Sequence, residues 1–129
     1  MLKGLFVLYV SDLYGFDVEA CYPEDLIYLR RTIGACIGPF LMSESEEPEL
    51  LKFPIGDYYY ISYSNQAKYR RILSLMTDDA EDLELFEAEF NKLINKIYST
   101  KDFQQYQSIL KESFETFLEI QNNVNREKL

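Results

Sequence analysis

The hydrophobic pattern at the start of the chain predicts a β-hairpin. Residues 5–10 are continuously apolar, which is typical of a strand that is covered on both faces. Residues 11–15 carry turn-forming residue types and end in a glycine that can adopt positive φ. Residues 16–22 alternate between apolar and polar positions, which predicts an edge strand with one polar face. The first strand is therefore expected in the centre of a sheet and the second at its edge.

The side chains of residues 16–22 are expected to divide between two faces, because successive side chains of a strand point to opposite sides of a sheet. One face is expected to consist of Phe16, Val18, Ala20 and Tyr22. The polar face is expected to consist of Asp17, Glu19 and Cys21.

A helix is expected between Pro23 and Pro39. The proline and two acidic residues at 23–25 suit the first turn of a helix. Apolar residues recur at helical spacing and form the expected buried stripe: Leu26, Leu29, Ile33, Cys36 and Ile37. Gly34 and Gly38 are expected to permit close approach to the sheet, and Pro39 is expected to end the helix.

The middle of the chain predicts three further strands. Residues 43–49 form a polar, acidic loop, interpreted as a solvated connector or, alternatively, as an electrostatic contact for a basic partner. The strand-forming and turn-forming segments that follow are a short strand at 51–53, a turn at 54–57, a strand at 58–63, a hairpin loop at 64–67 and a strand at 69–76.

Two helices are expected in the last third of the chain. Thr77 or Asp78 is expected to cap the first of them. Its buried stripe is expected to consist of Leu83, Phe86, Phe90, Leu93, Ile94 and Ile97. The stripe of the last helix is expected to consist of Phe103, Tyr106, Leu110, Phe114, Phe117 and Leu118. Residues 122–129 lose apolar content and are expected to fray, which leaves residues 1–121 as a single domain. The order ββαβββαα predicts an α+β fold in which helices cover the sheet.

Composition and charge narrow the classes of partner. With 129 residues, 47% of them apolar, the chain can bury a core without disulfides or metals. Twenty-two acidic residues against 13 basic ones give a formal net charge of −9, which disfavours binding to nucleic acid or to anionic lipid. A basic protein surface is favoured as a partner for the same electrostatic reason. The initial apolar run is too short to span a bilayer, and we expect a cytoplasmic protein without direct membrane insertion.

Residue types needed for common catalytic machinery are scarce. The chain has no histidine, and its two cysteines, Cys21 and Cys36, are interpreted as small buried thiols. Neither a Walker A nor a GxGxxG motif occurs. The acidic residues between Asp78 and Glu84 are better explained by helix capping than by metal binding. Sequence spacing does not exclude a catalytic pair of carboxylates that the fold brings together. We expect no enzymatic activity, no cofactor and no metal.

Tyrosines at 58–60 and 63 are the most unusual local feature. In a strand, Tyr58 and Tyr60 share one face while Tyr59 and Tyr63 share the other. One pair can pack beneath helices, and the other would then be exposed as an interface anchor.

The element order and hydrophobic pattern resemble the longin domain of the profilin-like group, which also includes the roadblock fold. The resemblance rests on the hairpin at 4–23, the strand pair at 55–61 and 71–78, and the long helix with Phe86 and Phe90. It implies a five-stranded antiparallel sheet of order 2-1-5-4-3, with one helix on one face and two on the other. It also implies a subunit or scaffold in small-GTPase regulation or in vesicle and membrane trafficking.

The expected binding surface combines the edge strand with the first helix. An edge strand offers backbone groups for sheet extension, and its acids suit a partner that has Lys or Arg opposite. The candidate interaction residues are Asp17, Glu19, Arg30, Arg31, Tyr59 and Tyr63. The expected partners are a second copy, a related longin or roadblock domain, and a small GTPase. A small-ligand sensor and a non-catalytic enzyme subunit are the alternative functions.

Overall fold

The computed structural model describes residues 1–11, 15–43, 47–65 and 71–127. Five strands form one antiparallel sheet in the order β2-β1-β5-β4-β3, as expected. The strands are β1 (Leu2–Ser11), β2 (Gly15–Tyr22), β3 (Glu49–Ile55), β4 (Tyr58–Ser64) and β5 (Arg71–Thr77). β1 is central and β2 lies at an edge, which confirms both placements. The predicted turn at 11–15 and the loops at 43–49 and 64–67 fall in part outside the described residues, as do the first two residues of the strand predicted at 69–76.

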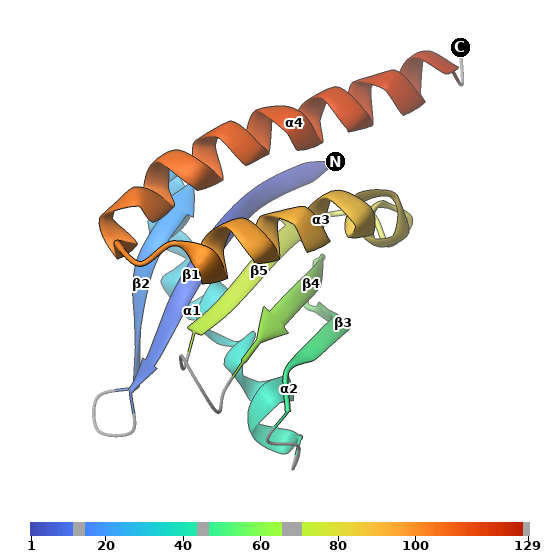
Figure 1. Ribbon diagram of the computed structural model, residues 1–129. Coiled ribbons are helices and arrows are strands. Elements are labelled where there is room, and N and C mark those ends of the chain that lie inside the picture. Colours follow the sequence, from blue (N-terminus) through green and yellow to red (C-terminus); the bar gives the residue numbers. More distant parts are fainter. Residues whose placement is uncertain (12–14, 44–46, 66–70, 128–129) are drawn as a thin grey trace.

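Helices cover both faces of the sheet (Figure 1). One face carries the 3₁₀ helix η1 (Glu24–Leu29), α1 (Arg30–Gly34) and α2 (Ile37–Met42). The other face carries α3 (Asp82–Ser99), the short 3₁₀ helix η2 (Phe103–Gln105) and α4 (Tyr106–Glu127). The predicted fold class is therefore confirmed, with the single first helix replaced by three short segments.

Each helical layer encloses its own hydrophobic cluster, because the central strands are buried on both faces. The cluster beneath α3 and α4 includes Leu5, Val7, Leu73, Leu75, Phe86, Phe90 and Phe117. The cluster beneath η1, α1 and α2 includes Phe6, Leu8, Ile33, Cys36, Phe40, Tyr60 and Met76.

The first predicted helix is broken, and three expectations about it are wrong. Leu29 is 39% exposed, because the segment is not one continuous α-helix and the 3.6-residue spacing does not bring this side chain into the core. Pro39 lies in the first turn of α2, where backbone N–H groups have no partner within the helix and a proline is tolerated. A Cβ added to Gly38 would meet no described atom within 4 Å beyond its own local backbone, so Gly38 permits no close approach. Gly34 does, since a Cβ there would lie 2.3 Å from the Phe16 ring.

A β-bulge in β2 overturns the predicted division of its side chains. Val7 pairs with Ala20 while Leu8 pairs with Val18, so Glu19 is an extra residue in the ladder. Before the bulge, Phe16 and Val18 pack toward the α1–α2 layer. After it, Ala20 and Tyr22 pack toward α3 and α4, and Cys21 lies buried on the opposite face. The four apolar residues therefore do not share one face.

Three boundaries also differ from the sequence predictions. β3 extends through Pro54, which the sequence pattern places in a turn. Phe103 is 52% exposed, because it lies in η2 before α4 begins. α4 continues to Glu127 past the predicted fraying point at 122, and its buried Gln121 accepts a hydrogen bond from Leu2 N–H at 2.7 Å.

Candidate functional site

The two acids predicted for the interaction surface have different environments. Asp17 is exposed on β2. Glu19 is instead paired within the chain, since Arg71 Nε and Nη2 donate to its two carboxylate oxygens at 2.6 and 3.2 Å. The Arg71 guanidinium also lies over the rings of Tyr9 and Tyr106, 5.4 and 5.6 Å from their centroids. The hydrogen bond that Arg71 donates to Glu19 raises the pKa of the guanidinium. The negative charge of Glu19 is therefore compensated by Arg71, and Glu19 does not offer a free charge to a partner.

The outer edge of β2 is partly covered by side chains of its own molecule. Gln107, near the start of α4, accepts from Cys21 N–H at 3.1 Å and donates to Cys21 C=O at 2.5 Å. Arg30 donates to Phe16 C=O at 2.7 Å, with its guanidinium 4.7 Å from the Phe16 ring centroid. A strand added at this edge would have to displace both contacts.

The opposite sheet edge, β3, carries two features that discourage strand addition. Ile55 pairs with Tyr58 across a two-residue turn at Gly56 and Asp57, so Pro54 falls at a position whose backbone faces outward. A proline there offers no donor to an incoming strand. The exposed Lys52 lies at the same edge and contacts Glu87 at 3.1 Å. Lysine and proline are common protections of an exposed edge.

An apolar patch on η1 is the feature that the sequence reasoning missed. Tyr28 is 88% exposed, and its neighbours Ile27 and Leu29 are 40% and 39% exposed. Arg30 and Arg31, both predicted interaction residues, are exposed directly beside them. We call the exposed group Glu24, Asp25, Ile27, Tyr28, Leu29, Arg30 and Arg31 the η1 surface. The sequence signal that could have revealed it is a repeat of acid, apolar residue and base at spacing three.

The tyrosine cluster is packed rather than exposed. Tyr59 and Tyr63 are half-buried against the α3–α4 cluster, and Tyr63 makes an edge contact with Tyr98 at 5.0 Å between centroids. Tyr58 is half-buried and Tyr60 is fully buried on the other face. The expectation that one pair would be exposed is wrong, because helices cover both faces of the sheet. Tyr59 and Tyr63 are thus separated from the η1 surface by the sheet itself.

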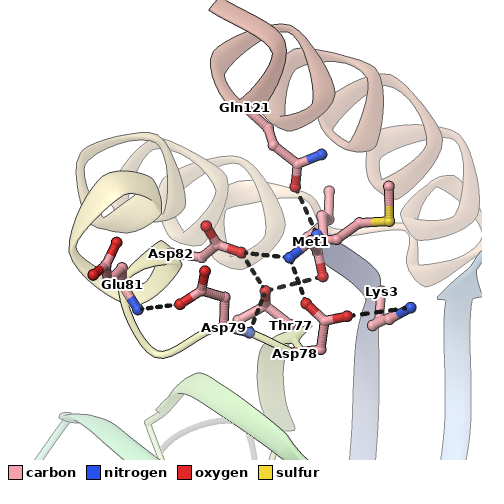
Figure 2. Close-up of polar contacts among 9 residues, drawn as sticks. Met1, Lys3, Thr77, Asp78, Asp79, Glu81, Asp82 and Gln121 are labelled. Carbon is pink, nitrogen blue, oxygen red and sulfur yellow. Dashed lines mark hydrogen bonds and ion pairs between the residues drawn. The ribbon is translucent and has the colours of Figure 1, made fainter. Parts of the chain in front are cut away.

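Two acidic residues, one before α3 and one at its first position, hold the start of β1 in place (Figure 2). The Met1 amino group lies 2.5 Å from Asp78 Oδ1 and 3.0 Å from Asp82 Oδ2. The hydrogen bond from this amino group lowers the pKa of Asp78. The Thr77 hydroxyl bonds to Asp82 at 2.5 Å, and neither Thr77 nor Asp78 caps α3, whose N-cap position is Glu81. Within the described residues, no group of three or more potential ligands is arranged to hold a metal ion.

Both cysteines are buried thiols in the cluster beneath η1, α1 and α2. Burial raises the pKa of Cys36 and of Cys21. Because the thiolate is the reactive form of cysteine, a raised pKa leaves both groups weak nucleophiles.

A surface cleft of about 430 Å³ opens where the end of α3 meets the start of α4. Its lining is mixed, with two tyrosine rings, two hydroxyl side chains and two cations. The lining residues are Arg71, Tyr98, Ser99, Thr100, Lys101 and Tyr106.

Comparisons with known proteins add no assignment. A scan against models of protein families finds no match, and a search of curated proteins finds none either. Across the described residues, none of the helices combines the length and the apolar character needed to cross a bilayer.

Proposed function

We propose that this chain is a non-catalytic protein-interaction domain, and that it binds its partner through the η1 surface. The observation that carries the proposal is the exposure of Tyr28 between Ile27 and Leu29, next to two arginines. Tyrosine and arginine are enriched among the residues that contribute most to binding free energy at protein interfaces. The helix η1 has an apolar residue facing the core and others facing solvent, so its outer side is suited to burial against a partner.

The charges around the same surface are mixed. Arg30 and Arg31 follow the apolar group along the chain, and Glu24 and Asp25 precede it. A partner with an apolar patch and both acidic and basic residues at its rim would match this arrangement.

The resemblance to longin domains supports a role as a subunit or scaffold in small-GTPase regulation or membrane trafficking. On that basis the partner classes are a related longin or roadblock domain and a small GTPase. The sheet order supports the resemblance at the level of topology alone.

Affinity purification from the native cell, followed by reconstitution with the purified partner, tests the proposal. Tyr28→Glu should abolish partner binding while leaving the melting temperature unchanged, because the side chain is almost fully exposed. Phe103→Glu is the matched control, since Phe103 is an exposed aromatic residue outside the η1 surface. Equal binding by the wild type and Tyr28→Glu would place the interface elsewhere.

The cleft lined by Lys101 and Tyr106 favours one alternative, a sensor of a small anionic ligand, in which Lys101 supplies the positive charge because Arg71 is already paired with Glu19. Screening small phosphorylated and carboxylated metabolites for a rise in melting temperature tests it. A rise that disappears in Lys101→Ala would support the alternative, and no rise with any compound would exclude it for these classes.

A further inference from the structure

We infer that the η1 surface docks on the η1 surface of a second copy of the chain, antiparallel about a twofold axis near Tyr28. The inference rests on the proposed function, since it names the partner of the same surface. In this arrangement Asp25 of one copy faces Arg31 of the other, while Arg30 keeps its hydrogen bond to Phe16.

The argument begins with the geometry of the 3₁₀ helix, in which side chains three residues apart lie in one row. Leu26 and Leu29 form the row nearest the core, with Leu26 buried. The two remaining rows are exposed. Within η1 they consist of Glu24 and Ile27, and of Asp25 and Tyr28. Leu29 departs from helical dihedrals, with φ −96° and ψ 25°, so the rows end with η1, and the exposed Arg31 follows them at the start of α1.

The exposed residues run along the chain from the acids Glu24 and Asp25 through Ile27 and Tyr28 to Arg31. A twofold axis near Tyr28 brings the apolar residues of two copies together and sets Asp25 opposite Arg31. An isologous interface requires this kind of self-complementarity. A partner presented in parallel would instead meet like charges, which disfavours that register.

The charges on either side of Tyr28 have no ion-pair partner within the described part of the chain. Asp25 and Arg31 form no ion pair with each other. Glu24 and Asp25 likewise form no ion pair among the described residues. A second copy would supply the missing partners on both sides of the apolar centre.

The same structure argues against pairing by sheet extension at β2. Gln107 and Arg30 hold outward-facing backbone groups of Cys21 and Phe16, so that route would break hydrogen bonds that already exist. Docking through η1 leaves the Gln107 contact intact. Because the η1 surface is small compared with stable interfaces, the expected dimer is weak and reversible.

A charge-swap experiment tests the inference in sedimentation equilibrium of the full chain at low salt. Asp25→Arg alone and Arg31→Asp alone should each weaken self-association at least tenfold, because each places like charges opposite one another at both ends. Mixing the two variants should restore association, since Arg at position 25 then faces Asp at position 31 and the native Asp25 faces the native Arg31. Lys111→Asp and Glu112→Arg, on exposed positions of α4, are the matched controls and should leave association unchanged.

The outcomes separate the inference from the proposed function. Failure of the mixed variants to associate, or a wild type that is monomeric at millimolar concentration, would overturn the inference. If the wild type is monomeric but Tyr28→Glu still abolishes binding of a different protein, the proposed function stands without the second copy. If Tyr28→Glu changes neither self-association nor binding to any partner, both fail.

Discussion

The side-chain amide of Gln107 bonds to both the N–H and the C=O of Cys21, in the way that a neighbouring strand would. The contact joins residues 86 positions apart and closes part of the β2 edge with a group from α4. It explains how a sheet with an exposed edge strand can avoid indiscriminate pairing. Because this edge is partly closed, the helical layer beside it is the more accessible surface for a partner.

Replacing Gln107 with alanine should lower the free energy of unfolding by about 1–3 kcal/mol, since two backbone groups lose their partner. Urea denaturation measures the loss, and hydrogen exchange at Cys21 N–H should accelerate in the same variant. Gln104→Ala is the control, because that side chain is exposed on η2. An unchanged exchange rate at Cys21 would contradict the assigned role of the amide.

The Glu19–Arg71 pair should show a measurable coupling in a double-mutant cycle. Both side chains are largely buried, and the contact has two hydrogen bonds. We expect a coupling free energy of about 1–3 kcal/mol between Glu19→Gln and Arg71→Met, measured by urea denaturation. The pair formed by Lys92 and Glu89 is exposed on the lysine side, so its cycle should give a much smaller value. Equal couplings for the two pairs would show that Glu19 is not held by Arg71 in solution.

Removing the ring of Phe90 should cost about 3–5 kcal/mol of unfolding free energy, because Phe90 is fully buried on the sheet-facing side of α3. Phe114 is 9% exposed on α4, and Phe114→Ala should cost less than Phe90→Ala. Thermal and chemical denaturation of both variants measure which substitution lowers the free energy of unfolding more. The exposed Phe103 provides the control, since Phe103→Ala should change stability little.

Acid should weaken the contact between Asp78 and the Met1 amino group. The hydrogen bond from that group lowers the pKa of Asp78 in the folded chain. A carboxyl with a lowered folded-state pKa stabilises the fold above its unfolded pKa, about 4, and loses that contribution as the pH falls through the folded value. Asp78→Asn should therefore lower the melting temperature near pH 7 and converge with the wild type at the lowest pH.

Melting curves between about pH 2 and pH 7 check this dependence. Asp57→Asn is the control, because Asp57 is an exposed aspartate in the turn between β3 and β4. A difference between Asp78→Asn and the wild type that stays constant over the whole range would contradict the ionic origin of the effect.

Much of the fold follows from local sequence patterns. The apolar run at 5–10 predicts a central strand, and the stripe containing Phe86, Phe90 and Leu93 predicts the buried face of α3. These patterns are reliable because a strand with two covered faces or a helix with one covered face must repeat its apolar residues at a fixed period. The charge of −9 and the lack of histidine likewise follow from the sequence alone.

What only the tertiary structure decided depends on contacts between distant residues. The bulge at Glu19 moves Cys21 to the opposite face, and no local pattern signals one extra residue in a ladder. Leu29 leaves helical geometry at the end of η1 and is exposed together with Tyr28, whereas a continuous α-helix predicts that Leu29 is buried. Gln107 reaches the β2 edge only because α4 packs across it. Sequence periodicity reports which residues avoid water, whereas the surfaces left for a partner depend on how the packed elements finally cover one another.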